Sequence, residues 1–220
     1  MGIAMELVPP AITVEPGHLG CVEVRLTNSG PEPCDVAVEV PAAERHWSWV
    51  HPESCGIAPG GEGVVSVYFK PACGPEPRAG AHRVGIRARC GDDPHLSAAA
   101  DGTVEVGAFT DVVATLDPLV GRGQRGFSYA VKLENKGNTA IRASLSGDDP
   151  SGGALLVDVE PAKVQAHPGE SVTATVAVQP RKALRRGEQR YRVCVVARVD
   201  GDGELRAEGS FYQQGRRPGR

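Results

Sequence analysis

The side chains best suited to metal or acid–base chemistry gather in one short stretch of the chain. His46, His51 and Cys55 lie within ten residues, and imidazole and thiolate are both ligands that zinc accepts. A structural zinc site usually needs four ligands, and only the distant Cys73 or Cys21 could supply the fourth. No spacing specifies either one. We therefore predict no metal site, and we interpret the histidines as solvated turn residues.

The sequence lacks the short motifs that mark a hydrolase or a phosphate-binding site. It contains no Gly-x-Ser-x-Gly turn, no His-Glu-x-x-His pair, no Cys-x-x-Cys pair and no Gly-x4-Gly-Lys-Ser/Thr loop. We predict that the chain is not an enzyme and has no catalytic residue, cofactor or metal ion. A hydrolase with an unrecognised site is an alternative. It would need a cleft that joins two of the following residues within hydrogen-bond reach: His46, His51, Cys73 and Asp92.

All of these residues lie within an internal sequence repeat, whose predicted strands and turns would position them. Residues 22–30 and 129–137 both alternate apolar and polar side chains and then end at Asn-x-Gly. Alternation with a period of two indicates a half-buried strand, and Asn and Gly mark the turn after it. The offset between these two stretches is 107 residues. A second set of turn residues recurs at an offset of 109 residues: Pro52, Pro59, Gly60 and Pro71 match Pro161, Pro168, Gly169 and Pro180.

Two copies of the repeat fill the 220-residue chain, because an immunoglobulin-like sandwich takes about 100 residues. We count about six or seven strands in each copy and find no apolar period of about 3.6 residues. The pattern predicts an all-β protein of two tandem immunoglobulin-like antiparallel β-sandwiches. We place the first sandwich in residues 1–108, the second in 109–213, and a disordered basic tail in 214–220.

Charge is distributed unevenly between the two halves. Residues 1–109 hold 7 Lys or Arg and 14 Asp or Glu, a net charge of −7, whereas residues 110–220 hold 17 and 13, a net charge of +4. This asymmetry favours head-to-tail association or an oriented partner, although surface drift without a functional role would produce it too. No segment is apolar enough to cross a bilayer, and residues 1–10 do not resemble a signal peptide. We therefore predict no membrane insertion and a cytoplasmic location.

Six cysteines are present, and five of them lie in the first half. Because the cytoplasm is reducing, we expect free thiols and not disulfides. Cys34 and Cys90 share the parity of the apolar residues in their strands, so we expect both in the core. Cys21 and Cys194 share the parity of charged neighbours, so we expect both at the surface.

Two groups of residues are candidates for an interaction surface. At an offset of 109, Trp47 aligns with Leu156 and Trp49 with Asp158. We therefore expect Trp47 in the core and Trp49 at the surface, as an anchor for a partner. The alternative is that Trp49 packs on its own loops or covers a sheet edge. The second group could bind an anionic partner and consists of Arg181, Lys182, Arg185 and Arg186.

These features favour a non-catalytic protein-interaction or structural module. We expect its partner to be another protein or a macromolecular assembly, such as a phage-tail-like particle or a polymer of the chain itself. A carbohydrate-associated accessory domain is an alternative, but Trp49 shows no aromatic neighbours in the sequence. Nucleic acid is not expected as a partner, because its binding requires stacking aromatics beside basic residues. The aromatics of the second half lie largely at strand positions whose side chains alternate toward the core.

Several turn motifs resemble those of a known family. They are the string 15–17 (Glu-Pro-Gly), the Asn-x-Gly strand ends, the Pro-x6-Pro-Gly turns and the joint 109–111 (Phe-Thr-Asp). Together they resemble a tandem immunoglobulin-like family of high-GC Gram-positive bacteria commonly labelled "hydrolytic protein", which is similar to the NEW3 domains attached to some glycosidases. The resemblance covers nearly the whole chain and implies the fold. It carries no catalytic residue over to this sequence, which also departs from the family in its many cysteines.

Overall fold

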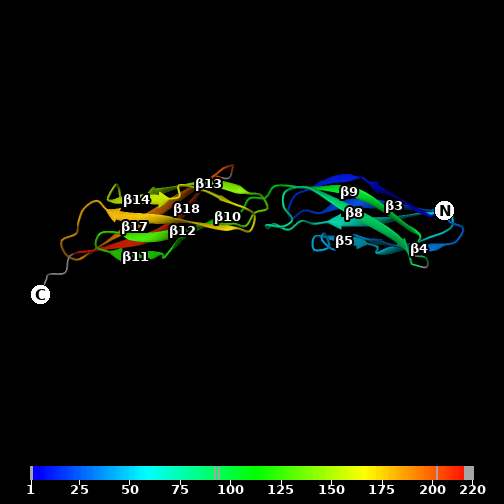
Figure 1. The fold of residues 1–220 in the computed structure, drawn as a ribbon, viewed down its shortest axis with the longest axis horizontal. Helices are drawn as coiled ribbons and strands as arrows, with labels where there is room; N and C mark the ends of the chain where they lie inside the picture. Colours follow the sequence, from blue (N-terminus) through cyan, green and yellow to red (C-terminus); the bar gives the residue numbers. More distant parts are fainter. Residues whose placement is uncertain (1, 92, 94, 202, 216–220) are drawn as a thin grey trace. The chain divides into compact units, whose positions relative to one another are not determined.

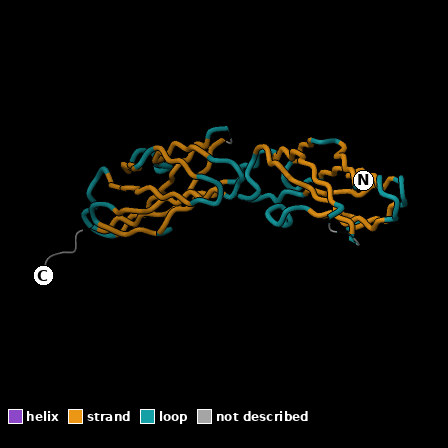
Figure 2. Tube along the Cα trace, turned by 45° about the vertical axis from the view of Figure 1, so that its right-hand side comes forward, coloured by secondary structure: helices purple, strands orange, loops and turns teal. Residues whose placement is uncertain are grey.

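The structure is a computed structural model that describes residues 2–91, 93, 95–201 and 203–215. Strands and turns make up this part of the chain (Figures 1 and 2), and it contains no helix, hence none that could span a membrane. The chain divides into two compact units, Met1–Phe109 (domain one) and Thr110–Arg220 (domain two). Each unit is a sandwich of two sheets, so the predicted fold class is confirmed.

Domain one packs a four-stranded sheet against a five-stranded sheet. The first has the order β1-β3-β7-β5, formed by Ile3–Val8, Gly20–Asn28, Glu62–Phe69 and Ser48–His51. The second has the order β2-β9-β8-β4-β6, formed by Ala11–Val14, Ser97–Val106, Gly80–Cys90, Cys34–Glu39 and Ser54–Ile57. Neighbouring strands are antiparallel except β2 and β9, which run parallel.

Domain two repeats this order strand for strand. Its four-stranded sheet is β10-β12-β16-β14, formed by Val112–Asp117, Phe127–Asn135, Ser171–Pro180 and Leu155–Glu160. Its five-stranded sheet is β11-β18-β17-β13-β15, formed by Val120–Gly123, Gly203–Gln214, Glu188–Val199, Ile141–Asp148 and Lys163–Ala166. The parallel pair is again the second strand with the last, β11 with β18. Gln214, expected in the tail, belongs to β18, and residues 216–220 lie outside the described residues.

Each domain has more strands than the about six or seven expected, because two segments cross from one sheet to the other. The first crossing lies at Val8–Pro9 and Asp117–Pro118, and the second at His51–Pro52 and Glu160–Pro161, all with cis peptide bonds. Proline has no N–H to donate, so it ends the hydrogen-bond ladder at each crossing. Each crossing segment therefore forms two strands, one in each sheet.

Both cores consist mainly of inward-facing Val, Leu, Ile and Ala residues, with a few aromatics. Trp47 is 5% exposed and packs on Phe69, with ring centroids 5.5 Å apart, which confirms its predicted place in the core. Its aligned partner Leu156 is 48% exposed on β14. Trp47 is therefore buried for a local reason: it precedes β5, in a turn that directs its side chain inward.

The cysteine predictions are confirmed in part. Cys34 and Cys90 are buried and Cys21 is exposed, as expected. The expectation of free thiols is wrong for Cys34 and Cys90, which form a disulfide with their Cα atoms 5.8 Å apart. Their strands β4 and β8 are neighbours in one sheet, with Cys90 opposite Val36. Strand pairing, which a single sequence does not show, brings the two sulfur atoms together.

The prediction that Cys194 is exposed is wrong, since this residue is 1% exposed. Its side chain follows the predicted parity, on the same face of β17 as Arg192. Long charged side chains flank it there: Arg192 pairs with Glu208 at 2.8 Å, and Arg206 pairs with Asp148 at 3.7 Å. Desolvation by burial raises the pKa of the Cys194 thiol above its ordinary value.

Candidate interaction surfaces

An aromatic pair lies on the outer face of the four-stranded sheet of domain one. Trp49 on β5 is opposite Tyr68 on β7, which is opposite Cys21 on β3. The two rings stack, with centroids 5.4 Å apart and planes inclined by 19°. Trp49 keeps 46% of its surface exposed. It therefore contacts its own sheet on one side and presents an apolar surface to solvent on the other.

The matching row in domain two has different chemistry. Strand pairing places Asp158 opposite Ala177, and Ala177 opposite Ser128, at the positions of Trp49, Tyr68 and Cys21. The same fold thus accepts a carboxylate, a methyl group and a hydroxyl where domain one has two stacked rings and a thiol. The fold itself does not require the aromatic pair.

A groove of about 460 Å³ opens beside the aromatic pair, between β5 and the end of β4. Its lining includes Val38, Val40, Val50, Trp49, Glu39 and Glu53, and these residues define the β5 groove. In domain two the corresponding strands, β13 and β14, are in close contact and, among the described residues, leave no groove between them. Gly147 of β13 lies so near Val157 of β14 that a Cβ atom added to the glycine would overlap the valine. Domain one ends β4 at Glu39 and turns away at Pro41, so this seal is not formed.

The β5 groove carries excess negative charge. Glu39 and Glu53 line it together with one cation, Arg45, whose Nε donates to the carbonyl of Val40 at 3.2 Å. In the same turn, Glu44 has a buried Oε2 atom with no hydrogen-bond partner among the described residues. A buried carboxylate oxygen without a donor is costly, but Glu44 does not line the groove.

The backbone of β5 offers hydrogen-bonding groups on its outer edge. β5 is an edge strand, and among the described strands it pairs with β7 alone. The Trp47 carbonyl accepts from Lys70 N at 2.7 Å, so by strand alternation Trp49 also turns its backbone groups toward β7. The N–H and C=O groups of Ser48 and Val50 therefore point away from the sheet. An extended segment of another chain could pair with them.

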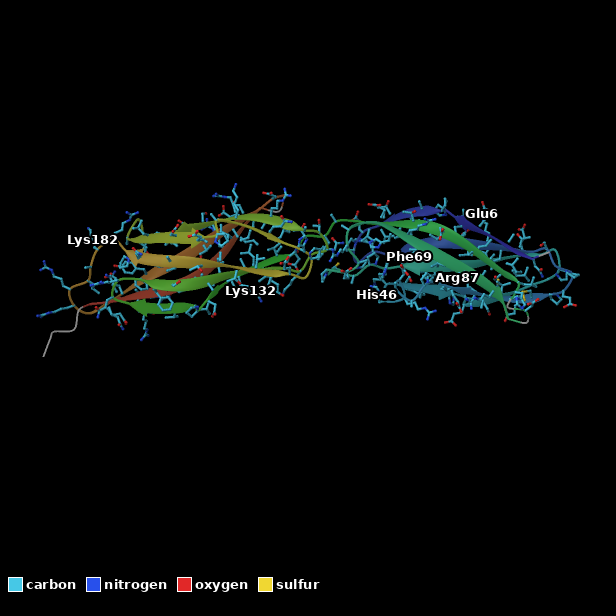
Figure 3. The ribbon with its side chains drawn as sticks, in the orientation of Figure 1. Glu6, His46, Phe69, Arg87, Lys132 and Lys182 are labelled. Atoms are coloured by element: carbon cyan, nitrogen blue, oxygen red, sulfur yellow. A yellow bond between two sulfur atoms is a disulfide. The ribbon has the colours of Figure 1, made fainter. Side chains whose placement is uncertain are left out.

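The predicted basic residues lie on the loop between β16 and β17, residues 181–187, termed here the basic loop. All four are exposed: Arg181, Lys182, Arg185 and Arg186. Figure 3 shows Lys182 on this loop. Two hydrogen bonds hold the ends of the basic loop. Gln213 Nε2 on β18 donates to the Lys182 carbonyl at 2.9 Å, and Gly215 N, just after β18, donates to the Gly187 carbonyl at 2.8 Å. The four cations and the half-buried Leu184 are thus presented on an anchored loop.

The sequence interpretation missed an aromatic residue beside this loop. Tyr212 lies on the outer face of β18, with Arg122 at 5.3 Å and Arg190 at 5.9 Å from its ring centroid. The expectation that aromatics of the second half lie in core phase therefore fails for Tyr212. Alternation could have revealed this, because its neighbour Phe211 is fully buried. Two guanidinium groups flanking one ring add to the positive surface of domain two.

The side chains considered for chemistry remain scattered. His46 and His51 are exposed and Cys55 is half-buried, and Asp92 lies outside the described residues. In the part of the chain that the structure describes, no three His, Cys, Asp or Glu side chains are placed to share a metal ion. Desolvation by burial, with a smaller contribution from nearby Asp35, raises the pKa of the Cys55 thiol, which disfavours its reactive thiolate form.

Several solved structures are similar to this chain in fold. The PcdhgB3 EC1-4 structure aligns with a TM-score of 0.50 at 12% identity, over 95% of this chain and 48% of that one. The E. coli chaperone DraB aligns with a TM-score of 0.35 at 14% identity, over 97% and 100% of the two chains. The Pseudomonas aeruginosa CupB2 chaperone gives 0.33 and 12%, over 91% and 97%. At 12% identity, the alignment with PcdhgB3 EC1-4 shows a likeness of fold alone. No protein-family profile and no curated protein sequence matches the chain.

Proposed function

We propose that this chain is a non-catalytic protein-interaction module, and that it binds its partner through the aromatic pair and the β5 groove of domain one. The observation that carries the proposal is the stacked pair of the exposed Trp49 and the half-buried Tyr68, at positions where domain two has Asp158 and Ala177. We further propose that the chain serves in a larger assembly, and that it belongs to the tandem immunoglobulin-like family that its turn motifs resemble.

Trp49 and Tyr68 have the chemistry of interface anchors. Large aromatic side chains contribute most to binding when a partner removes them from water. Here they lie next to an open groove and a free strand edge, so a single partner segment can contact all three. Strand addition supplies backbone hydrogen bonds, and the groove selects the side chains. This combination supports binding of an extended polypeptide.

Carbohydrate binding is the second candidate, and one observation favours it. The sequence interpretation found no aromatic neighbour for Trp49, but the structure places Tyr68 directly beside it. An exposed ring and a half-buried ring on one sheet face resemble a platform for a sugar ring. Their mutual stacking leaves each ring only one free face, which limits the area open to a sugar.

A comparative pull-down tests the proposal. Tagged wild type, Trp49→Ala and Val64→Ala are incubated with lysate from the native cells, and bound proteins are identified by mass spectrometry. Val64 is the matched control, because it is an equally exposed apolar residue on the outer face of the same sheet, at 52%. We expect wild type and Val64→Ala to recover the same partner, and Trp49→Ala to lose it.

Two other outcomes would contradict the proposal. If wild type recovers nothing above background, the interaction module is ruled out for those cells. If a panel of polysaccharides is bound by wild type and not by Trp49→Ala, while no protein is recovered, the carbohydrate candidate replaces it.

A further inference from the structure

We propose that the partner of the β5 groove is the basic loop of a second copy of this chain, so that copies associate head to tail. The inference rests on the proposed function and names the occupant of the proposed site. It joins two surfaces that lie on different domains and that otherwise have no common role.

Charge complementarity is the first argument. Domain one carries a net charge of −7 over residues 1–109, and domain two +4 over residues 110–220. The local charges also differ in sign: the groove is lined by two carboxylates, Glu39 and Glu53, and by one cation, Arg45. The basic loop presents four exposed cations and no carboxylate. Groups of opposite sign attract over about 10 Å at 0.1 M salt and orient two copies so that domain one of one meets domain two of the other.

The shape of the loop is the second argument. Residues 183–185 have no regular secondary structure, so their backbone N–H and C=O groups can pair with the free edge of β5. Leu184 is an apolar side chain between pairs of cations, Arg181 and Lys182 on one side and Arg185 and Arg186 on the other. It suits a groove lined by Val38, Val40 and Val50, with acidic residues beside the valines.

The two surfaces differ, so the contact is heterologous. Each contact joins the β5 groove of one copy to the basic loop of the next. A free groove therefore remains at one end of the assembly and a free basic loop at the other. Association of this kind continues into a chain or closes into a ring. An isologous dimer would instead stop at two copies. This difference makes the proposal testable without a structure of the complex.

The test uses full-length variants that each lack one of the two surfaces. Arg185→Ala with Arg186→Ala disables the loop, and Trp49→Ala disables the groove. Sedimentation velocity at 0.1 M NaCl should show wild type growing into larger species with concentration. Each variant alone should associate at least tenfold more weakly. An equimolar mixture should form dimers and nothing larger, because one intact groove meets one intact loop.

A charge swap supplies the second measurement. Glu39→Lys with Glu53→Lys should abolish association, and so should Arg185→Glu with Arg186→Glu. The four substitutions combined in one chain should restore it. All of these side chains are exposed, and circular dichroism will check that every variant is folded. For wild type, 1 M NaCl should weaken association, because it shortens the screening length to about 3 Å.

Several results would overturn the inference. These are a wild type that stays monomeric at all concentrations, variants that associate as wild type does, a mixture that grows past dimers, or a charge swap that fails to restore association in a folded chain. If wild type is monomeric but recovers a Trp49-dependent partner from lysate, the interaction module stands and only self-association is refuted.

Discussion

Asn28 and Asn135 make the same three side-chain hydrogen bonds at equivalent corners of the two sandwiches. Asn28 Nδ2 donates to the carbonyls of Glu32 at 2.7 Å and Ile57 at 3.2 Å, and its Oδ1 accepts from Gly30 N at 2.9 Å. Asn135 repeats the set with Thr139, Ala166 and Gly137. Each asparagine therefore joins the end of one sheet to the edge strand of the other.

Replacing Asn28 by Ala should destabilise domain one by about 3 kcal/mol, because the substitution leaves two carbonyls and one N–H without partners. Denaturant unfolding followed by tryptophan fluorescence measures this directly, since both tryptophans lie in domain one. Glu32→Ala is the control: it removes an exposed side chain and keeps the accepting carbonyl, so it should cost less than about 0.5 kcal/mol. Equal effects of the two substitutions would refute the role of the corner.

Trp47 and Trp49 should differ sharply in their effect on stability. Trp47→Ala removes a buried ring that packs on Phe69 and should cost about 3–5 kcal/mol. Trp49→Ala should cost less than about 1 kcal/mol, the size of one exposed aromatic stacking contact. Each variant retains one tryptophan as a fluorescent reporter. A large loss of stability for Trp49→Ala would mean that the aromatic pair serves the fold and not a partner.

The disulfide predicts a definite number of reactive thiols. Unfolded protein alkylated without reductant should carry adducts on the four free cysteines, namely Cys21, Cys55, Cys73 and Cys194. After reduction all six should react, and domain one should lose about 2–5 kcal/mol of stability. The double variant Cys34→Ala with Cys90→Ala should not respond to reductant. Six adducts on protein taken directly from its cells would show that the bond is absent there, as the proposed reducing cytoplasm requires.

The buried phenol of Tyr129 predicts a loss of stability in alkali. Its hydroxyl donates to the carbonyl of Ser210 at 2.8 Å, and burial raises its pKa from 10.0 to about 12. Between these values the folded state keeps a proton that the unfolded state releases. Stability is therefore fully present below pH 10 and falls as the pH rises through about 12.

Urea unfolding of wild type and Tyr129→Phe, followed by circular dichroism over this pH range, isolates the contribution of Tyr129. The variant should be less stable at neutral pH because Ser210 loses its donor, but its stability should fall less steeply in alkali. Parallel curves for the two proteins would contradict the assignment.

Local patterns in the sequence predicted much of the fold. Alternation placed the core of strands such as β3 and β12 correctly, and the Asn-x-Gly ends marked the two corners. The sheet crossings at Pro9 and Pro52 were missed, because a single sequence does not show which neighbouring strand each half of a crossing segment pairs with. The burial of Cys194 was missed for another reason: the arginine side chains that flank it come partly from a neighbouring strand.

The candidate site depended on relationships that one sequence does not contain. The offset of 109 correctly matched Trp49 with Asp158, but the stacking partner Tyr68 became visible only when β5 was paired with β7. The groove could not be predicted, because it arises from a short β4 and the turn that follows. The two domains differ at this position. In domain two, the close approach of Gly147 to Val157 closes the edge of the sandwich that is open as a groove in domain one.

The parallel pairing of the second and last strands of each domain has a mechanical consequence. β2 is bonded to β9 over four residue pairs, and β11 to β18 over four. When the ends of a domain are pulled apart, the two strands of such a pair slide along each other. All of their hydrogen bonds are then loaded together and do not open one at a time. A chain built this way resists stretching at two seams in series, a property useful to any component that must transmit force.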